Sequence, residues 1–256
     1  MDKNSYQTNI SGWGGYPIQE AKVVYPKNIK QILEEMKKSD LIARGNGRAY
    51  GDSSINKKNT INMKYFNHII SFDDSSGVLE VESGILLEDI VNTFLPKGWF
   101  PYVTPGSKFV TIGGLIAADV HGKNHHKDGS FRNFVEWFEL INSKGEIIKC
   151  SRNENKDMFE WTLGGMGLTG IIIRAAIKLR PIETCWIKQK TLVANNIDQI
   201  LEIFEKNMDA TYSVAWINST TGRNNIGQSL IMLGEHAKIN DLDQRNSLNP
   251  LKIKSK

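Results

Sequence analysis

The chain has 256 residues, of which 40% are hydrophobic and 23% charged, and it contains 22 glycines and 7 prolines. These values are typical of a globular protein and exclude disordered, collagen-like and low-complexity chains. Lysine and arginine together number 32 and acidic residues 28, so the formal net charge is only +4. Because the lysines are spread along the whole sequence, we expect no nucleic-acid partner.

The cysteine content and the hydropathy of the chain indicate the cellular compartment in which the protein works. Cys150 and Cys185 are the only cysteines, too few for a disulfide framework or a Cys-x-x-Cys metal site, which favours a reducing compartment. Residues 1–6 show no basic patch followed by an apolar run, and no stretch approaches the ~18 uninterrupted apolar residues of a membrane span. We therefore expect a cytoplasmic protein without a transmembrane segment.

The predicted elements alternate between helices and strands along the chain. Helices are predicted where apolar residues recur at i, i+3, i+4 and i+7, and strands where apolar residues alternate or run together. In chain order they are a strand at 21–25, a helix at 29–36, strands at 41–43 and 77–82, a helix at 87–94, paired strands at 134–141 and 146–149, a strand at 171–179, a helix at 197–204 and a strand at 212–217. Hairpins occur beside crossovers, so we predict an α+β fold with mixed sheets.

A domain boundary is predicted near residues 182–186, where the composition changes after Pro181. From His236 onward the chain is nearly all polar and has no hydrophobic period. We expect a first domain at 1–184 and, at 185–256, the start of a second α+β domain that looks truncated. About 70 residues with so little apolar sequence would struggle to fold alone.

The first glycine-rich segment, 44–51, reads Arg-Gly-Asn-Gly-Arg-Ala-Tyr-Gly and directly follows a predicted strand. Its glycines would let backbone amides approach a diphosphate. A nicotinamide-binding Rossmann turn requires a helix next, whereas residues 52–59 are loop-like and the glycine spacing is one residue too long. We reject that fold. A simple tight turn remains an equally good interpretation of this segment alone.

The second segment, 105–122, is more specific. Thr111 can cap a helix, and Gly113 and Gly114 would let a bulky ligand press against the backbone. The helix dipole would favour a pyrophosphate at this end. A helix from Thr111 to Val120 would rise ~15 Å and carry His121 away from the phosphates. The alternative is a close helix–helix contact through small residues.

Residues 121–126 form a polar cluster, His-Gly-Lys-Asn-His-His. His121 and His125 have the spacing of a zinc helix, but Gly122 interrupts the turn and no carboxylate completes the motif, so we reject zinc. An active-site rim, with His121 and Lys123 beside a cofactor or an anionic substrate, fits better. For Lys123, His125 and His126, a solvated basic loop remains open.

A third glycine-rich turn, 164–170, leads into the strand predicted at 171–179. Three such turns in one chain suggest a shared cause. A large, flat, phosphate-bearing cofactor that lies across the fold would supply one, because each turn can offer backbone amides where a side chain would clash.

Together these motifs resemble the FAD-binding domain of the vanillyl-alcohol oxidase superfamily, also called the PCMH-type flavin domain. The run 121–126 is similar to the polyprenylphosphoryl-ribose oxidases within it. The residues that carry the resemblance are Gly12-Trp13-Gly14, 43–52, 111–114, 119–126, 164–171 and 213–216.

The resemblance implies a PCMH-type domain of two α+β subdomains around FAD, followed by an incomplete α+β substrate domain. Many members attach FAD covalently through a histidine in the first glycine loop; Arg48 stands there in this chain, which implies a dissociable cofactor. The residues expected around FAD are Ala43, Arg44, Gly45, Asn46, Gly47, Arg48, Ala49, Tyr50, Gly51, Asp52, Ser53, Gly106, Thr111, Ile112, Gly113, Gly114, Ala118, Asp119, Val120, His121 and Ile172.

The resemblance also implies an activity. Members oxidise a sugar or polyol carbinol by hydride transfer to the flavin while a base takes the hydroxyl proton. We expect the 2-hydroxyl of a polyprenylphosphoryl-ribose-like pentose, a precursor of cell-wall arabinan, as the reacting group. Tyr50, His121 and Lys123 are the expected catalytic residues, and Lys123 and Trp216 are expected to contact substrate.

Two further expectations concern partners and alternatives. A short-chain reductase subunit would complete an epimerisation, and a lipid-linked sugar would bring the protein to the membrane surface. The family's catalytic lysine and closing flavin segment have no counterpart within these 256 residues. An aldonolactone or alditol oxidase and a truncated, non-catalytic flavin-binding module therefore remain alternatives.

Overall fold

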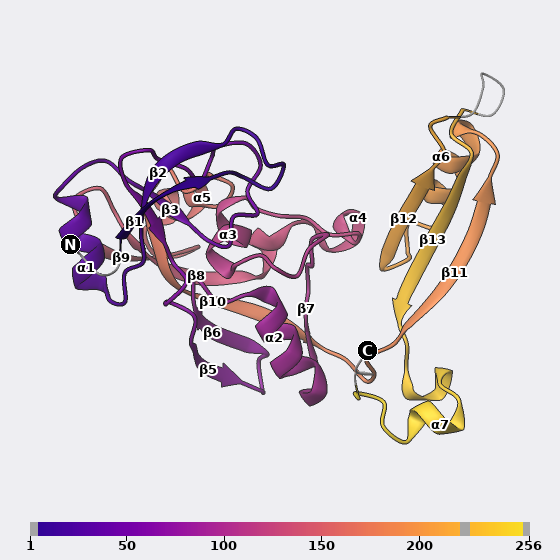
Figure 1. Cartoon of the computed structure of the whole chain (residues 1–256). Coiled ribbons are helices and arrows are strands. Elements are labelled where there is room, and N and C mark those ends of the chain that lie inside the picture. The colour runs from indigo at the N-terminus through magenta and orange to yellow at the C-terminus, as the bar shows by residue number, and fades with distance from the viewer. Residues whose placement is uncertain (1–4, 221–225, 253–256) are drawn as a thin grey trace. The chain divides into compact units, whose positions relative to one another are not determined.

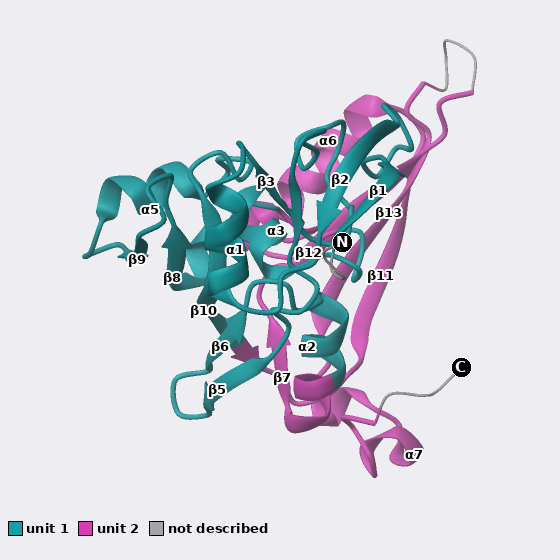
Figure 2. Ribbon diagram, turned by 60° about the vertical axis from the view of Figure 1, so that its left-hand side comes forward, with its two compact units in different colours: residues 1–92, 106–120, 131–179 teal, residues 93–105, 121–130, 180–256 magenta. Residues whose placement is uncertain are grey.

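The computed structural model describes residues 5–220 and 226–252, and the chain divides into two compact units (Figure 2). Unit 1 comprises Met1–Asn92, Gly106–Val120 and Phe131–Leu179, and unit 2 comprises Thr93–Pro105, His121–Ser130 and Arg180–Lys256. Unit 2 thus combines the C-terminal part of the chain with two earlier segments. One of them contains His121 and Lys123.

Unit 1 contains two sheets (Figure 1). In the first, β1 and β2 are antiparallel, whereas β4 is parallel to both β2 and β3. Its order is β1-β2-β4-β3, with bounds Ser5–Ile10, Gln19–Val24, Ile42–Arg44 for β3 and Thr60–Asn62 for β4. The second sheet is antiparallel, in the order β5-β6-β10-β8-β9. Its strands are β5 (Ile69–Asp73), β6 (Val78–Glu82), β8 (Val135–Ile141), β9 (Ile147–Ser151) and β10 (Ile171–Pro181).

Helix α1 (Ile29–Met36) shows how local sequence and packing agree. The Asn28 side chain accepts a hydrogen bond from the Gln31 amide at 3.0 Å and caps the first turn. Ile32 is fully buried in one core cluster with residues of both sheets, among them Ile61 and Ile171. The other helices with residues in unit 1 are α2 (Leu87–Phe94), α3 (Ile112–Ala117) and α5 (Lys156–Thr162), together with a 3₁₀ turn at Phe131–Phe134.

Unit 2 is built on a three-stranded antiparallel sheet in the order β11-β13-β12. Helix α6 (Ile197–Lys206), capped by Asn196, buries Ile200 against one face of that sheet. The strands are β11 (Ile187–Ala194), β12 (Tyr212–Ile217) and β13 (Ser229–His236). The smaller elements are 3₁₀ turns at Leu95–Lys97 and Ile239–Asp241, β7 (Trp99–Pro101), α4 (His125–Asp128) and α7 (Gln244–Ser247).

The predicted α+β class is confirmed, and so are the helix at 29–36, the helix at 87–94 and the strand at 212–217. The missed strands are β1, β4, β5, β7, β11 and β13. Most of the β11 side chains are exposed and several are polar, so the strand carries no apolar run. Within residues 5–220 and 226–252, no helix is long and apolar enough to cross a membrane.

Candidate flavin-binding pocket

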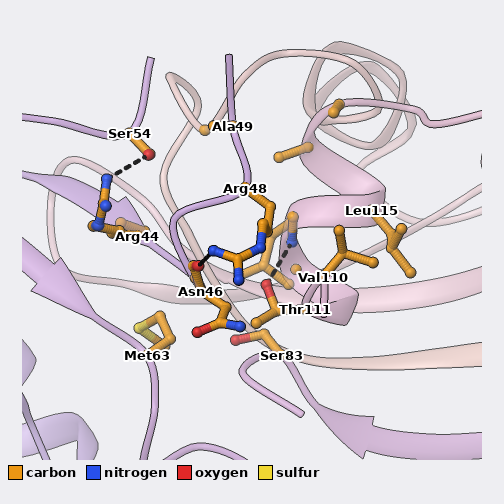
Figure 3. A pocket seen from close by; sticks show the side chains of 18 of the residues that line it. Arg44, Asn46, Arg48, Ala49, Ser54, Met63, Ser83, Val110, Thr111 and Leu115 are labelled. Carbon is orange, nitrogen blue, oxygen red and sulfur yellow. Dashed lines mark hydrogen bonds between the residues drawn. The ribbon is translucent and has the colours of Figure 1, made fainter. Parts of the chain in front are cut away.

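A pocket of about 900 Å³, including the solvent at its mouth, lies entirely within unit 1. The first glycine segment forms one wall, and α3 with its flanking residues forms another (Figure 3). Its lining residues are Ala43, Arg44, Gly45, Asn46, Gly47, Arg48, Ala49, Ser53, Ser54, Met63, Ser83, Val110, Thr111, Gly113, Gly114, Leu115, Ala117, Ala118, Val120, Met166, Gly167, Gly170 and Ile172.

The first glycine segment is held in place by Arg44. This buried side chain donates to the Ser11 carbonyl at 2.7 Å and to Ser54 Oγ at 3.2 Å (Figure 3). Burial lowers the pKa of Arg44, with the Arg48 charge adding to the effect and Tyr25 opposing it. Gly47 has a φ of +66°, and a β-carbon there would lie 2.6 Å from Arg44 Nη2. Glycine is therefore required at 47 by both the backbone and its neighbour.

The start of α3 lies close to the first glycine segment. Thr111 caps α3 by accepting a hydrogen bond from the Gly114 amide at 3.3 Å (Figure 3). A β-carbon on Gly45 would lie only 2.3 Å from Thr111 Oγ1, so glycine at 45 permits this close approach. The capping role expected for Thr111 is confirmed.

The amides at the start of α3 are already engaged, contrary to the expectation that they would bind a pyrophosphate. Ile112 N donates to Ile85 O at 3.1 Å, and Gly113 N donates to Ser83 O at 2.7 Å. Gly114 N donates to the Thr111 cap. Six residues of helix also provide only a small dipole.

The donors that remain for phosphate belong to the first glycine segment. Among the described residues, no group accepts a hydrogen bond from the backbone amides of 45–49. Arg48 Nε and Ser83 Oγ, which both line the pocket, are buried and have no hydrogen-bond partner within the described ranges. Buried polar atoms without partners are costly. A phosphate-bearing ligand would satisfy them, so these residues fit FAD.

The third glycine segment contacts the end of α3. Gly164 N donates to Ile116 O at 3.1 Å and Met166 N donates to Ala117 O at 2.8 Å, while Val120 N, just after the helix, donates to Leu115 O at 3.2 Å. The predicted helix from 111 to 120 is wrong in length: α3 ends at Ala117 and Asp119 adopts a φ of +40°. His121 does not lie at the end of a ten-residue helix.

The predicted cofactor residues fall into three groups. Those that line the pocket are Ala43, Arg44, Gly45, Asn46, Gly47, Arg48, Ala49, Ser53, Thr111, Gly113, Gly114, Ala118, Val120 and Ile172. Those of unit 1 outside the lining are Tyr50, Gly51, Asp52, Gly106, Ile112 and Asp119. Ile112 is fully buried in the core, Tyr50 is exposed, and the Asp119 carboxylate pairs with Arg132 Nε at 2.5 Å. His121, like Lys123 and Trp216, belongs to unit 2.

Sequence reasoning missed several lining residues. Met63 and Ser83 each follow a strand and belong to no motif, so nothing in the local sequence indicated them. Met166, Gly167 and Gly170 lie in the third glycine segment, whose pattern did suggest contact with a cofactor. The other missed residues are Ser54, Val110, Leu115 and Ala117.

In unit 2, the 121–130 segment closes on itself and is held by several side chains. His121 forms an antiparallel bridge with Ser130, and its ring lies edge-on to that of His125 at 5.5 Å. Asn124 is fully buried and donates to Tyr102 O at 2.8 Å and to Asp128 Oδ2 at 2.6 Å. His121 and Lys123 themselves are exposed.

Comparison with known proteins agrees with this geometry. Residues 21–151 match the family described as FAD binding domain. The chain is 34% identical to decaprenylphosphoryl-beta-D-ribose oxidase of Mycolicibacterium smegmatis (strain ATCC 700084 / mc(2)155), covering 95% of this chain and 55% of that protein. It is 28% identical to cytokinin dehydrogenase 3 of Arabidopsis thaliana, over 67% of this chain and 35% of that protein. It is 29% identical to D-lactate dehydrogenase of Anaerostipes hadrus, over 53% of this chain and 30% of that protein.

The chain therefore belongs to the PCMH-type family of FAD-binding domains, and FAD is its cofactor. The expected family and cofactor are confirmed. The chain spans about half the length, or less, of the curated relatives it matches.

Proposed function

We propose that this chain provides the flavin-binding part of an FAD-dependent oxidoreductase that oxidises a carbinol of a sugar-type substrate. The proposed reacting group is the 2-hydroxyl of a polyprenylphosphoryl-ribose-like pentose. The supporting observation is the similarity over 95% of the chain to a decaprenylphosphoryl-beta-D-ribose oxidase. It extends well beyond the 21–151 match to the FAD-binding family alone.

The residues of the pocket have separate roles in this proposal. Bound FAD supplies a two-electron acceptor for the hydrogen on the carbinol carbon. Arg48 and the amides of 45–49 hold the diphosphate, and Met63, Leu115 and Ile172 contribute apolar surface to the lining. Because no histidine occupies position 48, the cofactor is held without a covalent bond.

The proposed catalytic residues are Tyr50, His121 and Lys123. His121 takes part in moving the hydroxyl proton, since an imidazole ring can both accept and donate a proton. Lys123, together with Trp216, contacts the substrate. Oxidation of the 2-hydroxyl gives a ketone, and a short-chain reductase partner that reduces it from the opposite face would complete an epimerisation.

The test is rapid mixing of the FAD-loaded protein with candidate substrates in the absence of oxygen. Loss of the visible flavin absorbance with a farnesylphosphoryl-ribose, but not with alditols or aldonolactones, supports the proposal. His121→Ala should slow flavin reduction by ~10²-fold without changing FAD content. The exposed His68 of unit 1, changed to Ala, serves as the control. Reduction by alditols alone would assign the alternative activity.

A further inference from the structure

The loop between β1 and β2 lies against the first glycine segment and is held there through its backbone. Ser11 O accepts a hydrogen bond from Arg44 Nη2 at 2.7 Å, and Trp13 N donates to Ala49 O at 2.7 Å. A β-carbon on Gly12 would lie 2.6 Å from Ala49 O, so glycine permits this close approach. The side chain of Trp13 takes no part in these contacts, which fix the position of the residue that carries it.

The ring of Trp13 packs against the side chain of Arg48. The guanidinium carbon of Arg48 lies 5.4 Å from the centre of the Trp13 ring, a distance at which an aromatic face attracts a cation. A second contact restrains the same guanidinium, because its Nη1 donates to Asn46 O at 3.1 Å (Figure 3). Trp13 is 57% exposed, so it is not a core residue, and its contact with Arg48 is the feature that distinguishes it.

These two contacts leave part of the Arg48 guanidinium available to a ligand. Its Nε is buried and has no hydrogen-bond partner within the described ranges, and Arg48 lines the pocket. A free arginine side chain loses rotamer entropy when a ligand fixes it, and this loss weakens binding. Because Trp13 and Asn46 restrict Arg48 before any ligand arrives, less of that entropy is lost on binding.

We infer that Trp13 is a positioning residue for FAD, which acts by holding the guanidinium of Arg48 toward the pocket. Trp13 is not among the residues that line the pocket, so its effect on FAD passes through Arg48. The inference rests on the proposed function, in which Arg48 holds the diphosphate of a cofactor without a covalent bond. A non-covalent cofactor is retained by such contacts alone, and its affinity therefore depends on how well Arg48 is positioned.

The experiment compares the FAD dissociation constants of the FAD-loaded chain and its variants, from the flavin fluorescence that appears on dilution. Trp13→Leu keeps the backbone contacts of the loop but removes the aromatic face, so it should weaken FAD binding ~5-fold. Trp13→Phe retains an aromatic face and should recover most of that affinity. The matched control is Trp137→Leu, because Trp137 also lies beneath a cation, Lys149 Nζ at 4.6 Å, but outside the pocket lining. It should leave FAD affinity unchanged.

A double-mutant cycle with Arg48→Met separates positioning from a general structural role. Combined with Arg48→Met, Trp13→Leu should change FAD affinity by no more than ~1.5-fold, because no guanidinium remains to be held. An equal loss with and without Arg48→Met would overturn the inference, as would a Trp13→Phe variant that binds FAD as weakly as Trp13→Leu. Trp13→Gln replaces Trp13→Leu if the latter fails to fold.

The outcomes also distinguish this inference from the proposed function. If Arg48→Met leaves FAD affinity unchanged, the diphosphate role proposed for Arg48 is refuted, and the role of Trp13 with it. If Arg48→Met weakens FAD binding but Trp13→Leu does not, only the inference about Trp13 is overturned. A chain that shows the expected coupling but oxidises no pentose would refute the oxidase assignment and leave the inference standing.

Discussion

Two adjacent glycines of α3 have different neighbours, and the difference can be measured. A β-carbon on Gly113 would lie 3.0 Å from Ser83 Cβ, whereas one on Gly114 meets only Thr111 Oγ1 at 3.1 Å. Gly114 is exposed and lines the pocket. A side chain at 113 would therefore displace Ser83 as well as any ligand in the pocket.

Gly113→Ala should lower the free energy of unfolding of the apoprotein by ~1–3 kcal/mol, because Ser83 must shift. Gly114→Ala should leave it within ~1 kcal/mol, since alanine favours the helix, but should weaken FAD binding about tenfold by narrowing the pocket. Urea unfolding and FAD titration measure the two effects. Equal stability of the Gly113→Ala variant and the parent would show that the helix moves to accommodate the new atom.

The residues of the pocket differ in how far sequence could identify them. Gly45 and Gly47 stand in a glycine-rich motif, which is typical of a backbone that another group approaches closely. Thr111 stands where a threonine would cap a helix. The sequence could therefore identify these three residues. Ser83 and Met63 line the pocket through tertiary placement alone. Their neighbours in the sequence carry no sign of that placement.

At the scale of elements, helices with a clear apolar stripe were predicted well, whereas the end of α3 was not. α1 begins where its pattern does because Asn28 caps its first turn. At the end of α3, Asp119 takes a φ of +40° and the amides of Asp119 and Val120 donate back to Ile116 O and Leu115 O. Gly164 and Met166, about 50 residues further along the chain, also donate to the last carbonyls of α3, and a local pattern cannot contain that interaction.

The Asp128–Arg180 pair should position the segment that carries His121 and Lys123. The two side chains are only 18% and 13% exposed, and Asn124 donates to the same carboxylate. Asp128→Asn should destabilise by about 2 kcal/mol, less than the ~3–5 kcal/mol for a fully buried pair. Amide exchange across 121–130 should accelerate about tenfold. Asp241→Asn, which removes the exposed pair with Lys188, should leave that exchange unchanged.

His236 should make the stability of unit 2 depend on pH. Burial lowers the pKa of His236 below its ordinary 6.5; Arg180 lowers it further, while Glu235 and Asp128 raise it. Its Nε2 shares a hydrogen bond with the Tyr212 hydroxyl at 2.9 Å. The unfolded chain then binds the proton more readily, so stability present at neutral pH is lost as pH falls below ~6.5. In His236→Gln, the urea midpoint of unfolding should change less between pH 7 and pH 5 than in the parent. If the midpoint changes as steeply in both proteins, another group causes the pH dependence of stability.

At the scale of the molecule, the pocket and the predicted substrate contacts belong to different units. All residues that line the pocket are in unit 1, whereas His121, Lys123 and Trp216 are in unit 2. Periodicity along the chain indicated one boundary after residue 184. It could not show that 121–130 folds with the last third of the chain, because the hydrogen bonds to Asp209, Ala210 and Ser213 are long-range.

FAD should therefore stabilise the two units unequally. A ligand that binds only the folded state adds RT ln(1 + [L]/Kd), about 2.7 kcal/mol at a hundredfold excess over Kd. That stabilisation should appear as slower amide exchange in 43–54, in α3 and in 164–172, with β11 and β13 unchanged. Acid precipitation should release intact FAD, since Arg48 offers no covalent attachment. Flavin retained in the pellet would contradict a dissociable cofactor, and equal protection of β11 and β13 would show that FAD binding also orders unit 2.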